Sequence, residues 1–507
     1  MFYVLRQENI SQCWSVTMAK SSDSNTFKIL DEVYQILKEE HVFDTSGKNQ
    51  VIEFIHPKQL QEKIDITITE DGATPEEIKK MIRQIARYSV KTSNPHFHNQ
   101  LYGGVDNYGL AGAWMTESLN TSQYTYEVAP VFMLIEREVL NKALSLANYP
   151  LFPDGDGVLC PGGSIANMYG MILGRYKKFP DVKTKGLSSL PPLAVFTSDC
   201  SHYSMLKGAH WLGLGTESVF SVKTDSFGRM NPQDLIRAID ESKTKGYVPY
   251  FVNATAGTTI LASIDPLDDI ATICKNNNLW FHVDACLGGT LLLSEKYRKR
   301  LKGIEKSNSI AWNPHKMLGA PFQCSLFLVR GKNLLHEANC AGATYLFQQD
   351  KFYDVSWDTG DKSVQCGRKV DAVKLWLMWR ARGTKELGNL VDTAMESAEY
   401  FFEKIKSREG FRLVFSEFDG NTICFWYVPP SMRGQDENDD WWKKLYDSTS
   451  KIKELLVLDG RLMIGYTPMK HKGFGNFFRM VVCCQPPPSH STMDFAIEQI
   501  EKIGGKL

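Results

Sequence analysis

The sequence has no excess of charge of either sign and no apolar run long enough to cross a membrane. Its 507 residues include 58 basic and 58 acidic side chains, so the formal net charge is zero. Balanced charge argues against a nucleic-acid-binding surface or an anionic-membrane surface. A membrane-spanning helix needs about 20 mainly apolar residues in succession, and no stretch approaches that length. We therefore expect no nucleic-acid partner and no membrane partner.

Paired cysteine motifs are also missing. The 11 cysteines are scattered, and none lies in a C-x-x-C pattern typical of zinc or redox sites, so we predict no metal site. An odd number of cysteines in a long chain is typical of reduced thiols. The residues from Met1 to Glu8 lack the basic, apolar and small-residue regions of a signal peptide. These features together predict a cytoplasmic protein.

The length predicts two or three domains, because 507 residues are too many for one compact core. Residues 1–93 have helical spacing from Thr26 and a helix start at Thr74-Pro75, and we expect this helical segment to pack on a partner subunit. Residues 94–375 are predicted to form a large α/β domain. Residues 376–507 are predicted to form a small α+β domain.

Within the large domain, strands and helices alternate from about residue 154 to 330. The predicted strands are 193–197, 219–222, 250–255, 279–283, 309–312 and 324–329, and the intervening helices include 232–245 and 265–276. Short apolar strands separated by amphipathic helices indicate a mainly parallel sheet covered on both faces. Ligands of such sheets bind at the carboxyl ends of the strands.

Two of the predicted strands end in residues that suit one cofactor. Asp284 closes the strand at 279–283, and Lys316 follows the strand at 309–312 after a break at Asn313-Pro314. In a pyridoxal phosphate site, a lysine forms a Schiff base with the cofactor aldehyde, and an aspartate keeps the pyridine nitrogen protonated. The alternative is structural, since a lysine after a strand is often solvated and an aspartate there often caps a helix. The order and placement of the pair favour the cofactor site.

Three further stretches offer contacts for such a cofactor. Gly163 and Ser164 precede a predicted helix at 168–176, where free backbone N–H groups and the serine hydroxyl can bind a phosphate. His202 follows another strand and can stack on a flat ring, or it can be a hydrogen-bonded structural histidine. Thr255 closes the strand at 250–255 and can contact the ring substituents.

Two candidate residues lie nearer the C-terminus. The polar stretch at 348–362 has no periodicity, which is typical either of a lid, with Tyr353 as its acid, or of an ordinary surface loop. Arg479 lies within an apolar strand, where a buried charge needs an anionic partner. A substrate carboxylate and a structural ion pair are equally suitable partners.

Several motifs together resemble the group II pyridoxal phosphate-dependent amino-acid decarboxylases. The resemblance runs from about Asn25 to the C-terminus and is strongest to the acidic branch, which contains glutamate decarboxylase, cysteine sulfinate decarboxylase and insect-type aspartate 1-decarboxylase. Its motifs are Asn313-Pro314-His315-Lys316, His282-Val283-Asp284-Ala285, Gln323-Cys324-Ser325, and the stretches 124–130 and 358–362. Residues 99–106 and 119–124 are closer to the cysteine sulfinate and aspartate enzymes than to glutamate decarboxylase.

The resemblance implies a fold, an oligomer and a set of site residues. The implied fold is that of the aspartate-aminotransferase-type (fold type I) enzymes, with pyridoxal 5'-phosphate as the cofactor and a homodimer whose lid crosses to the neighbouring site. The implied catalytic residues are Lys316, Asp284, His202 and Tyr353. The implied cofactor contacts also include Gly163, Ser164, Thr255, Asn313 and His315, and the implied substrate contacts are Gln100 and Arg479. His98 departs from the aromatic or apolar residue usual in the family, which suggests a changed substrate pocket.

The predicted reaction is the α-decarboxylation of a small acidic amino acid, either L-aspartate to β-alanine or cysteine sulfinate to hypotaurine. Glutamate decarboxylation to GABA and, less favoured, transamination remain alternatives. Glutamate is one methylene longer than aspartate, which changes binding by only about 1–3 kcal/mol, so the sequence does not separate these substrates.

Overall fold

The structure, a computed structural model, describes residues 28–483 and 485–507. The predicted helix start at Thr26 and the N-terminal residues before it lie outside the described residues. The chain divides into two compact units, the first containing residues up to 44 and 52–90, and the second containing 45–51 and 91–507. No helix in the described ranges is both long enough and apolar enough to span a bilayer.

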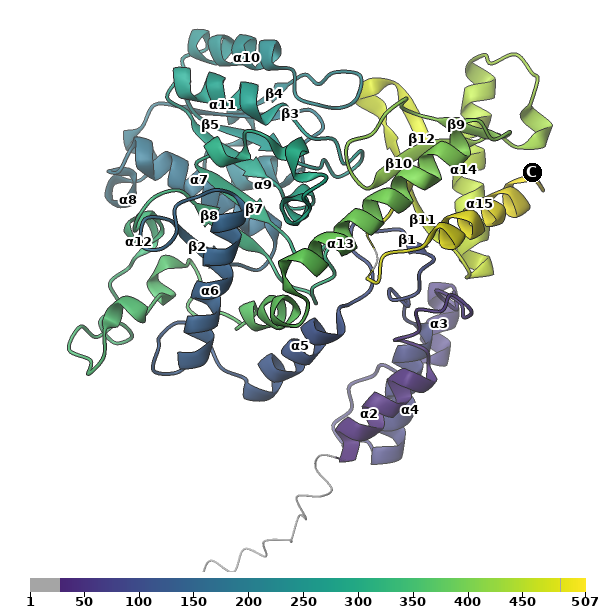
Figure 1. The fold of residues 1–507 in the computed structure, drawn as a ribbon, viewed down its shortest axis with the longest axis horizontal. Helices are drawn as coiled ribbons and strands as arrows, with labels where there is room; N and C mark the ends of the chain where they lie inside the picture. The colour runs from purple at the N-terminus through teal and green to yellow at the C-terminus, as the bar shows by residue number, and fades with distance from the viewer. Residues whose placement is uncertain (1–27, 484) are drawn as a thin grey trace, which may run out of the picture. The chain divides into compact units, whose positions relative to one another are not determined.

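The first unit consists of three helices, α2 (Lys28–Glu39), α3 (Pro57–Lys63) and α4 (Pro75–Tyr88). Helix α4 begins as predicted, with a capping box: the amide of Glu77 donates to Thr74 Oγ1, and the Glu77 carboxylate accepts from the amide of Thr74. Helices α2 and α4 lie side by side (Figure 1) and are joined by ion pairs from Arg83 to Glu39 and Glu40.

The second unit contains a seven-stranded, mostly parallel sheet, which confirms the predicted fold class. The strands are β2 (Asp156–Leu159), β3 (Leu193–Ser198), β4 (Val219–Val222), β5 (Val248–Thr255), β6 (Trp280–Asp284), β7 (Ser309–Trp312) and β8 (Leu326–Val329). Their order is β2-β8-β7-β6-β5-β3-β4, and only the pairs that include β8 are antiparallel. The carboxyl ends of β3, β5, β6 and β7 therefore meet at one edge.

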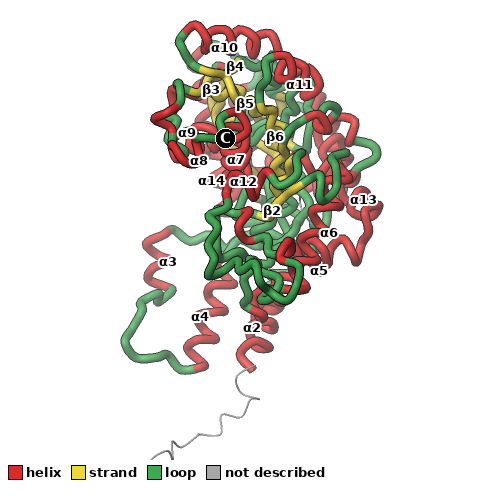
Figure 2. Tube along the Cα trace, turned by 90° about the vertical axis from the view of Figure 1, so that its left-hand side faces the viewer, coloured by secondary structure: helices red, strands yellow, loops and turns green. Residues whose placement is uncertain are grey.

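Helices cover both faces of this sheet. They are α6 (Pro130–Leu146), α7 (Gly163–Lys178), α9 (Ser204–Trp211), α10 (Pro232–Thr244), α11 (Leu267–Asn276) and α12 (Leu334–Asn339). Helix α5 (Asn107–Leu119) packs instead on a later helix at Ala372–Lys406, and the short α8 (Val182–Lys185) packs on α7. In β3, Ala194 and Phe196 pack in the cluster that includes α6, α10 and α11, whereas Leu193 and Val195 pack with α7, α9 and α12. Successive strand residues point to opposite faces, and Figure 2 shows the yellow strands between two layers of red helices.

A second sheet of five strands lies in the C-terminal region. It consists of β1 (Phe97–His98), β9 (Phe411–Leu413), β10 (Thr422–Tyr427), β11 (Met463–Met469) and β12 (Phe474–Val481), in the order β1-β11-β12-β10-β9. Helices α14 (Asp439–Asp459) and α15 (His490–Gly504) pack against it. Strand β1 pairs in parallel with β11, so a segment that we assigned to the large domain contributes a strand to this sheet.

A long helix, α13 (Ala372–Lys406), crosses the predicted boundary at residue 375. It bends at Gly383, whose φ of 70° is outside the helical range, and it contacts α5 and α6 as well as α15. Figure 1 shows it running from the region of α5 towards α14. The division at residues 93 and 375 remains a prediction.

Candidate active site

Asp284 and Lys316 lie at the carboxyl ends of two adjacent parallel strands. Asp284 is the last residue of β6 and pairs with Ala311 of β7, and Lys316 follows β7 after a short turn. Burial raises the pKa of the Asp284 carboxyl, but the Lys316 ammonium and hydrogen bonds from Cys286 and Asn167 lower it more, so the pKa lies below its usual range. Asp284 is therefore a carboxylate at neutral pH, although it is only 5% exposed.

A chain of hydrogen bonds holds the Asp284 carboxylate in place. The side-chain amide of Asn167 donates to Asp284 Oδ2 at 2.8 Å, and its carbonyl oxygen lies 3.0 Å from Nε2 of His282. Nδ1 of His282 lies 2.8 Å from the hydroxyl of Ser309. Because an amide oxygen only accepts, Nε2 of His282 carries the proton. The network therefore fixes both the position and the rotamer of the aspartate.

The N-terminus of α7 forms a close-fitting cradle beside the loops that follow Asp284 and β7. The structure starts α7 at Gly163, earlier than the predicted residue 168, because Gly162 has a φ of 104° and ends the preceding loop. A Cβ at Gly163 would lie 2.8 Å from Nδ2 of Asn313 and closer still to Sγ of Cys286, so only glycine fits. No side chain caps the helix, and Ser164 lies half-buried in its first turn. The free amides there are suited to an anion.

His202 and Thr255 complete the arrangement around Asp284. Burial lowers the pKa of His202, the Lys316 ammonium adds to this effect, and Asp284 opposes it. Nδ1 of His202 accepts a hydrogen bond from the amide of Ser204, so the neutral ring carries its proton on Nε2. Thr255 pairs with Asp284 across β5 and β6, and its buried hydroxyl has no partner among the described residues.

His315 fixes the turn between Asn313 and Lys316. Its Nδ1 lies 2.7 Å from the carbonyl oxygen of Cys324, and its ring packs 4.2 Å from that of Phe322. Burial lowers the pKa of His315 to about 4, so the ring is neutral at physiological pH. The Nδ1 proton then donates to the carbonyl, which orients Nε2 away from Cys324.

The deciding observation for the family is a match over most of the chain. Residues 57–428 match the family described as "Pyridoxal-dependent decarboxylase conserved domain". The chain belongs to the pyridoxal-dependent decarboxylase family. It is 49% identical over 481 residues to the cysteine sulfinic acid decarboxylase of Mus musculus, covering 94% of this chain and 96% of the relative. It is 48% identical over 482 residues to the acidic amino acid decarboxylase GADL1 of Xenopus tropicalis, covering 95% and 93%.

Solved structures agree with this assignment. The crystal structure of mouse CSAD superposes with a TM-score of 0.92 at 48% identity, covering 96% of this chain and all of that chain. The predicted family, fold type, carboxy-lyase class and pyridoxal phosphate cofactor are thereby confirmed.

The residues of this pyridoxal-dependent decarboxylase fit its cofactor. The uncapped start of α7 and the close approach at Gly163 suit a phosphate, and the side-chain Oδ1 of Asn313 next to it is buried without a partner in the described ranges. The carboxylate of Asp284 suits a protonated ring nitrogen, and the unpartnered hydroxyl of Thr255 faces the same strand ends. Orphaned buried polar groups of this kind are rare in folded proteins unless they bind a ligand.

Arg479 reaches the large sheet of this decarboxylase from β12. Its Nη1 donates to the carbonyl of Thr259, in the loop that follows Thr255, at 2.8 Å. Its Nε is buried without a hydrogen-bond partner, and no carboxylate among residues 28–483 and 485–507 forms an ion pair with it. Burial lowers the pKa of the guanidinium. Gln100 is exposed, and its backbone carbonyl accepts from the thiol of Cys483 at 3.6 Å.

The structure does not bring Tyr353 together with Lys316. The Tyr353 hydroxyl donates to Asp358 at 3.0 Å and accepts from Lys351 at 3.1 Å, and its ring lies 5.4 Å from that of Tyr126. Across the described ranges, no hydrogen bond or ring contact joins it to the residues around Asp284. Figure 1 shows the segment between α12 and α13 extending past α6.

The sequence patterns predicted no role for Asn167 or His282, although both residues lie beside predicted site residues. His282 is two residues before Asp284 in the same strand, and period-two alternation places both on one face. Asn167 lies four residues after Gly163, which is one helical turn along the same face of α7. These spacings were signals that could have identified the positioning network.

Proposed function

We propose that this enzyme decarboxylates a small acidic amino acid, converting cysteine sulfinate to hypotaurine and L-aspartate to β-alanine. The observation that carries the proposal is Arg479, a half-buried cation whose Nε is buried without a partner among the described residues, close to the strand ends that hold Asp284. A guanidinium N–H that is shielded from water and left unpaired is costly, so it indicates an anionic ligand. The names of the two similar decarboxylases support an acidic substrate.

The roles of the cofactor-side residues follow from their positions. When bound, pyridoxal phosphate supplies an electron sink for the bond between Cα and the α-carboxylate. Lys316 holds the cofactor through its amine and yields to the substrate amine. Asp284 keeps a proton on the ring nitrogen, and Asn167 prevents that carboxylate from turning away. His202 offers a flat, neutral ring for stacking, while Gly163 and Ser164 bind the phosphate.

The substrate-side residues control which bond breaks. Arg479, with Gln100, is proposed to bind the side-chain acid of the substrate and so to fix the orientation of the substrate beside the cofactor. A bidentate guanidinium fixes a carboxylate in direction as well as in place. Tyr353 is proposed to return a proton to Cα after carbon dioxide leaves.

We propose that the enzyme is a cytoplasmic homodimer. The dimer accounts for two further features. Tyr353 is separate from the cofactor residues of its own chain, so we propose that it acts at the site of a second subunit. Large apolar side chains are exposed on α5 and α6, and a subunit interface would cover them: Tyr108, Met115, Leu119, Val131 and Leu134. Large apolar side chains exposed together on a surface are typical of an interface.

A substrate panel tests the proposal. Purified enzyme with pyridoxal phosphate is incubated with aspartate, cysteine sulfinate, cysteate and glutamate, and carbon dioxide and the amine products are measured. We expect release of carbon dioxide with the shorter acids preferred over glutamate by about 10–200-fold, the range that one methylene allows. Turnover of aromatic amino acids alone would refute the acidic-substrate proposal. Keto-acid formation without carbon dioxide would indicate transamination instead.

A further inference from the structure

Three potential metal ligands from distant parts of the chain converge outside the cofactor site. Asp199 and Cys200 follow β3, whereas His471 lies in η9 (Lys470–Lys472), the short helix between β11 and β12. Sγ of Cys200 lies 3.7 Å from Nε2 of His471, and the three ligand atoms all lie within 4.8 Å of one another. The cluster therefore combines sulfur, nitrogen and carboxylate oxygen.

The distance between the sulfur and nitrogen ligands matches tetrahedral coordination. Zinc binds cysteine sulfur at about 2.3 Å and histidine nitrogen at about 2.0–2.1 Å, which separates the two ligand atoms by about 3.6 Å at a tetrahedral angle. The observed 3.7 Å from Cys200 to His471 needs almost no adjustment. The carboxylate of Asp199 is oriented by the hydroxyl of Thr224, which donates to Oδ1 at 2.7 Å. Ligating carboxylates typically have such an outer hydrogen bond.

We propose that Asp199, Cys200 and His471 bind one zinc-type divalent cation, with water as the fourth ligand. Binding replaces the thiol proton of Cys200 by the metal, and the proton passes to solvent without any redox change. The mix of one sulfur, one nitrogen and one oxygen ligand favours zinc over magnesium or calcium, which prefer oxygen ligands alone.

A second cluster, His336, Cys340 and Asp361, is less suited to a metal and provides an internal comparison. Both carboxylate oxygens of Asp361 already accept backbone N–H groups, from Ala341 and Gly342. Sγ of Cys340 accepts directly from the Lys183 ammonium at 3.1 Å, and a cation in contact with the thiol opposes a bound metal. Lys472, the cation that acts on Cys200, instead donates to the backbone carbonyls of Thr224 and Asp225.

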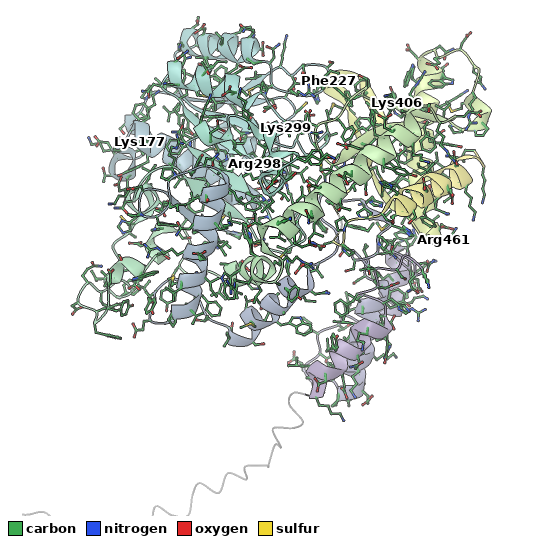
Figure 3. All side chains as sticks on the ribbon, in the orientation of Figure 1. Lys177, Phe227, Arg298, Lys299, Lys406 and Arg461 are labelled. Carbon is green, nitrogen blue, oxygen red and sulfur yellow. The ribbon has the colours of Figure 1, made fainter. Side chains whose placement is uncertain are left out.

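The proposed metal would connect the two sheets. Cys200 is two residues before His202, and η9 leads into β12, which carries Arg479. Lys472 on η9 already donates to the carbonyl of Asp225 at 2.7 Å. Figure 3 shows Phe227, in the same loop as Asp225, beside the yellow C-terminal strands. A metal here would hold the loop before the stacking histidine against the strand that carries the substrate arginine.

Cobalt(II) substitution tests the site in the full-length, tag-free enzyme loaded with its cofactor. Tetrahedral cobalt with a thiolate ligand gives visible d–d bands at wavelengths beyond the cofactor absorption. We expect one cobalt per chain with these bands, displaced by zinc, and we expect zinc affinity to be measurable by competition with a chromophoric chelator. Added zinc should also raise the melting temperature, because a ligand that binds only the folded state stabilises it.

Variants separate the proposed site from other binding. Cys200→Ser and His471→Gln should each lower zinc affinity at least about tenfold, and Thr224→Val should lower it about 10–100-fold through the lost outer hydrogen bond. Cys340→Ser is the matched control and should keep both the bands and the affinity. Melting in metal-free buffer checks that each variant folds. Cobalt bands that survive Cys200→Ser, bands lost in Cys340→Ser, or no zinc binding above the level of Cys200→Ser would overturn the proposal.

Discussion

Replacing Gly163 with alanine should weaken cofactor binding without unfolding the protein. The added Cβ would lie 2.8 Å from Nδ2 of Asn313 and closer to Sγ of Cys286. Real Cβ atoms do not approach neighbours within 3.0 Å, so the buried side chains must move. Overpacking of this kind costs about 1–3 kcal/mol. If Asn313 moves into the space that the phosphate needs, this free-energy cost weakens cofactor binding. The dissociation constant for pyridoxal phosphate should then rise about 5–150-fold.

The assay is a titration of apoenzyme with pyridoxal phosphate, followed by protein fluorescence, together with melting curves of the apoenzyme. The matched control is Gly367→Ala, because Gly367 has no atom within 4 Å of its would-be Cβ and has no positive φ. Removing the nearer obstacle in Gly163→Ala/Cys286→Ala should restore part of the affinity, with a coupling energy of about 0.5–3 kcal/mol. A folded Gly163→Ala enzyme that binds pyridoxal phosphate as tightly as the parent would refute the assignment of the phosphate cradle.

Four other side chains give measurable expectations. Burial lowers the pKa of His282 to about 4, so below about pH 6.5 the unfolded chain binds a proton that the folded chain does not. The free energy of unfolding should therefore fall by about 3 kcal/mol between pH 6.5 and 4, and His282→Gln should remove this part of the fall in denaturant titrations. Arg479→Met should raise KM for acidic substrates at least about tenfold with little change in melting temperature, whereas breaking a buried ion pair would cost about 3–5 kcal/mol. Asn167→Leu loses a hydrogen bond to a charged group worth about 1.5–3 kcal/mol, so kcat/KM should fall about 10–150-fold in steady-state assays, and an unchanged value would exclude a positioning role. Tyr353→Phe should raise the ratio of aldehyde to amine product measured by chromatography, and an unchanged ratio would exclude it as the proton donor.

The sequence predicted the parts of the fold that depend on local patterns. Alternating apolar strands and helices predicted the parallel sheet, and the polar residues at strand ends identified Asp284 and Lys316. Two strands were missed. β1 has only two residues and therefore no period to detect, and β2 has four residues that begin with aspartate and glycine, which are depleted in strands. Their pairing depends on contacts with strands far along the chain, which no local pattern contains.

The site was predicted less completely, for a similar reason. From the sequence, a structural ion pair and a substrate contact were equally good interpretations of Arg479. The partner of a charge within a strand depends on the tertiary fold, which the local sequence does not contain. In the structure, Arg479 donates a hydrogen bond to the backbone carbonyl of Thr259, and no carboxylate among the described residues pairs with it. The proposed role of Tyr353 requires a second subunit, so neither the sequence nor one chain places it at a catalytic centre.

The parallel pairing of β1 with β11 has a consequence for biosynthesis. His98 on β1 is fully buried and its Nδ1 lies 3.0 Å from the carbonyl of Val481 on β12, yet β11, the strand that pairs with β1, is translated near the end of the chain. During translation, β1 leaves the ribosome long before β11 is synthesised. Until then β1 stays unpaired, and it either remains exposed or is bound by chaperones. A premature stop codon before Met463 would therefore expose residues near the N-terminal end of the protein, far in sequence from the lesion.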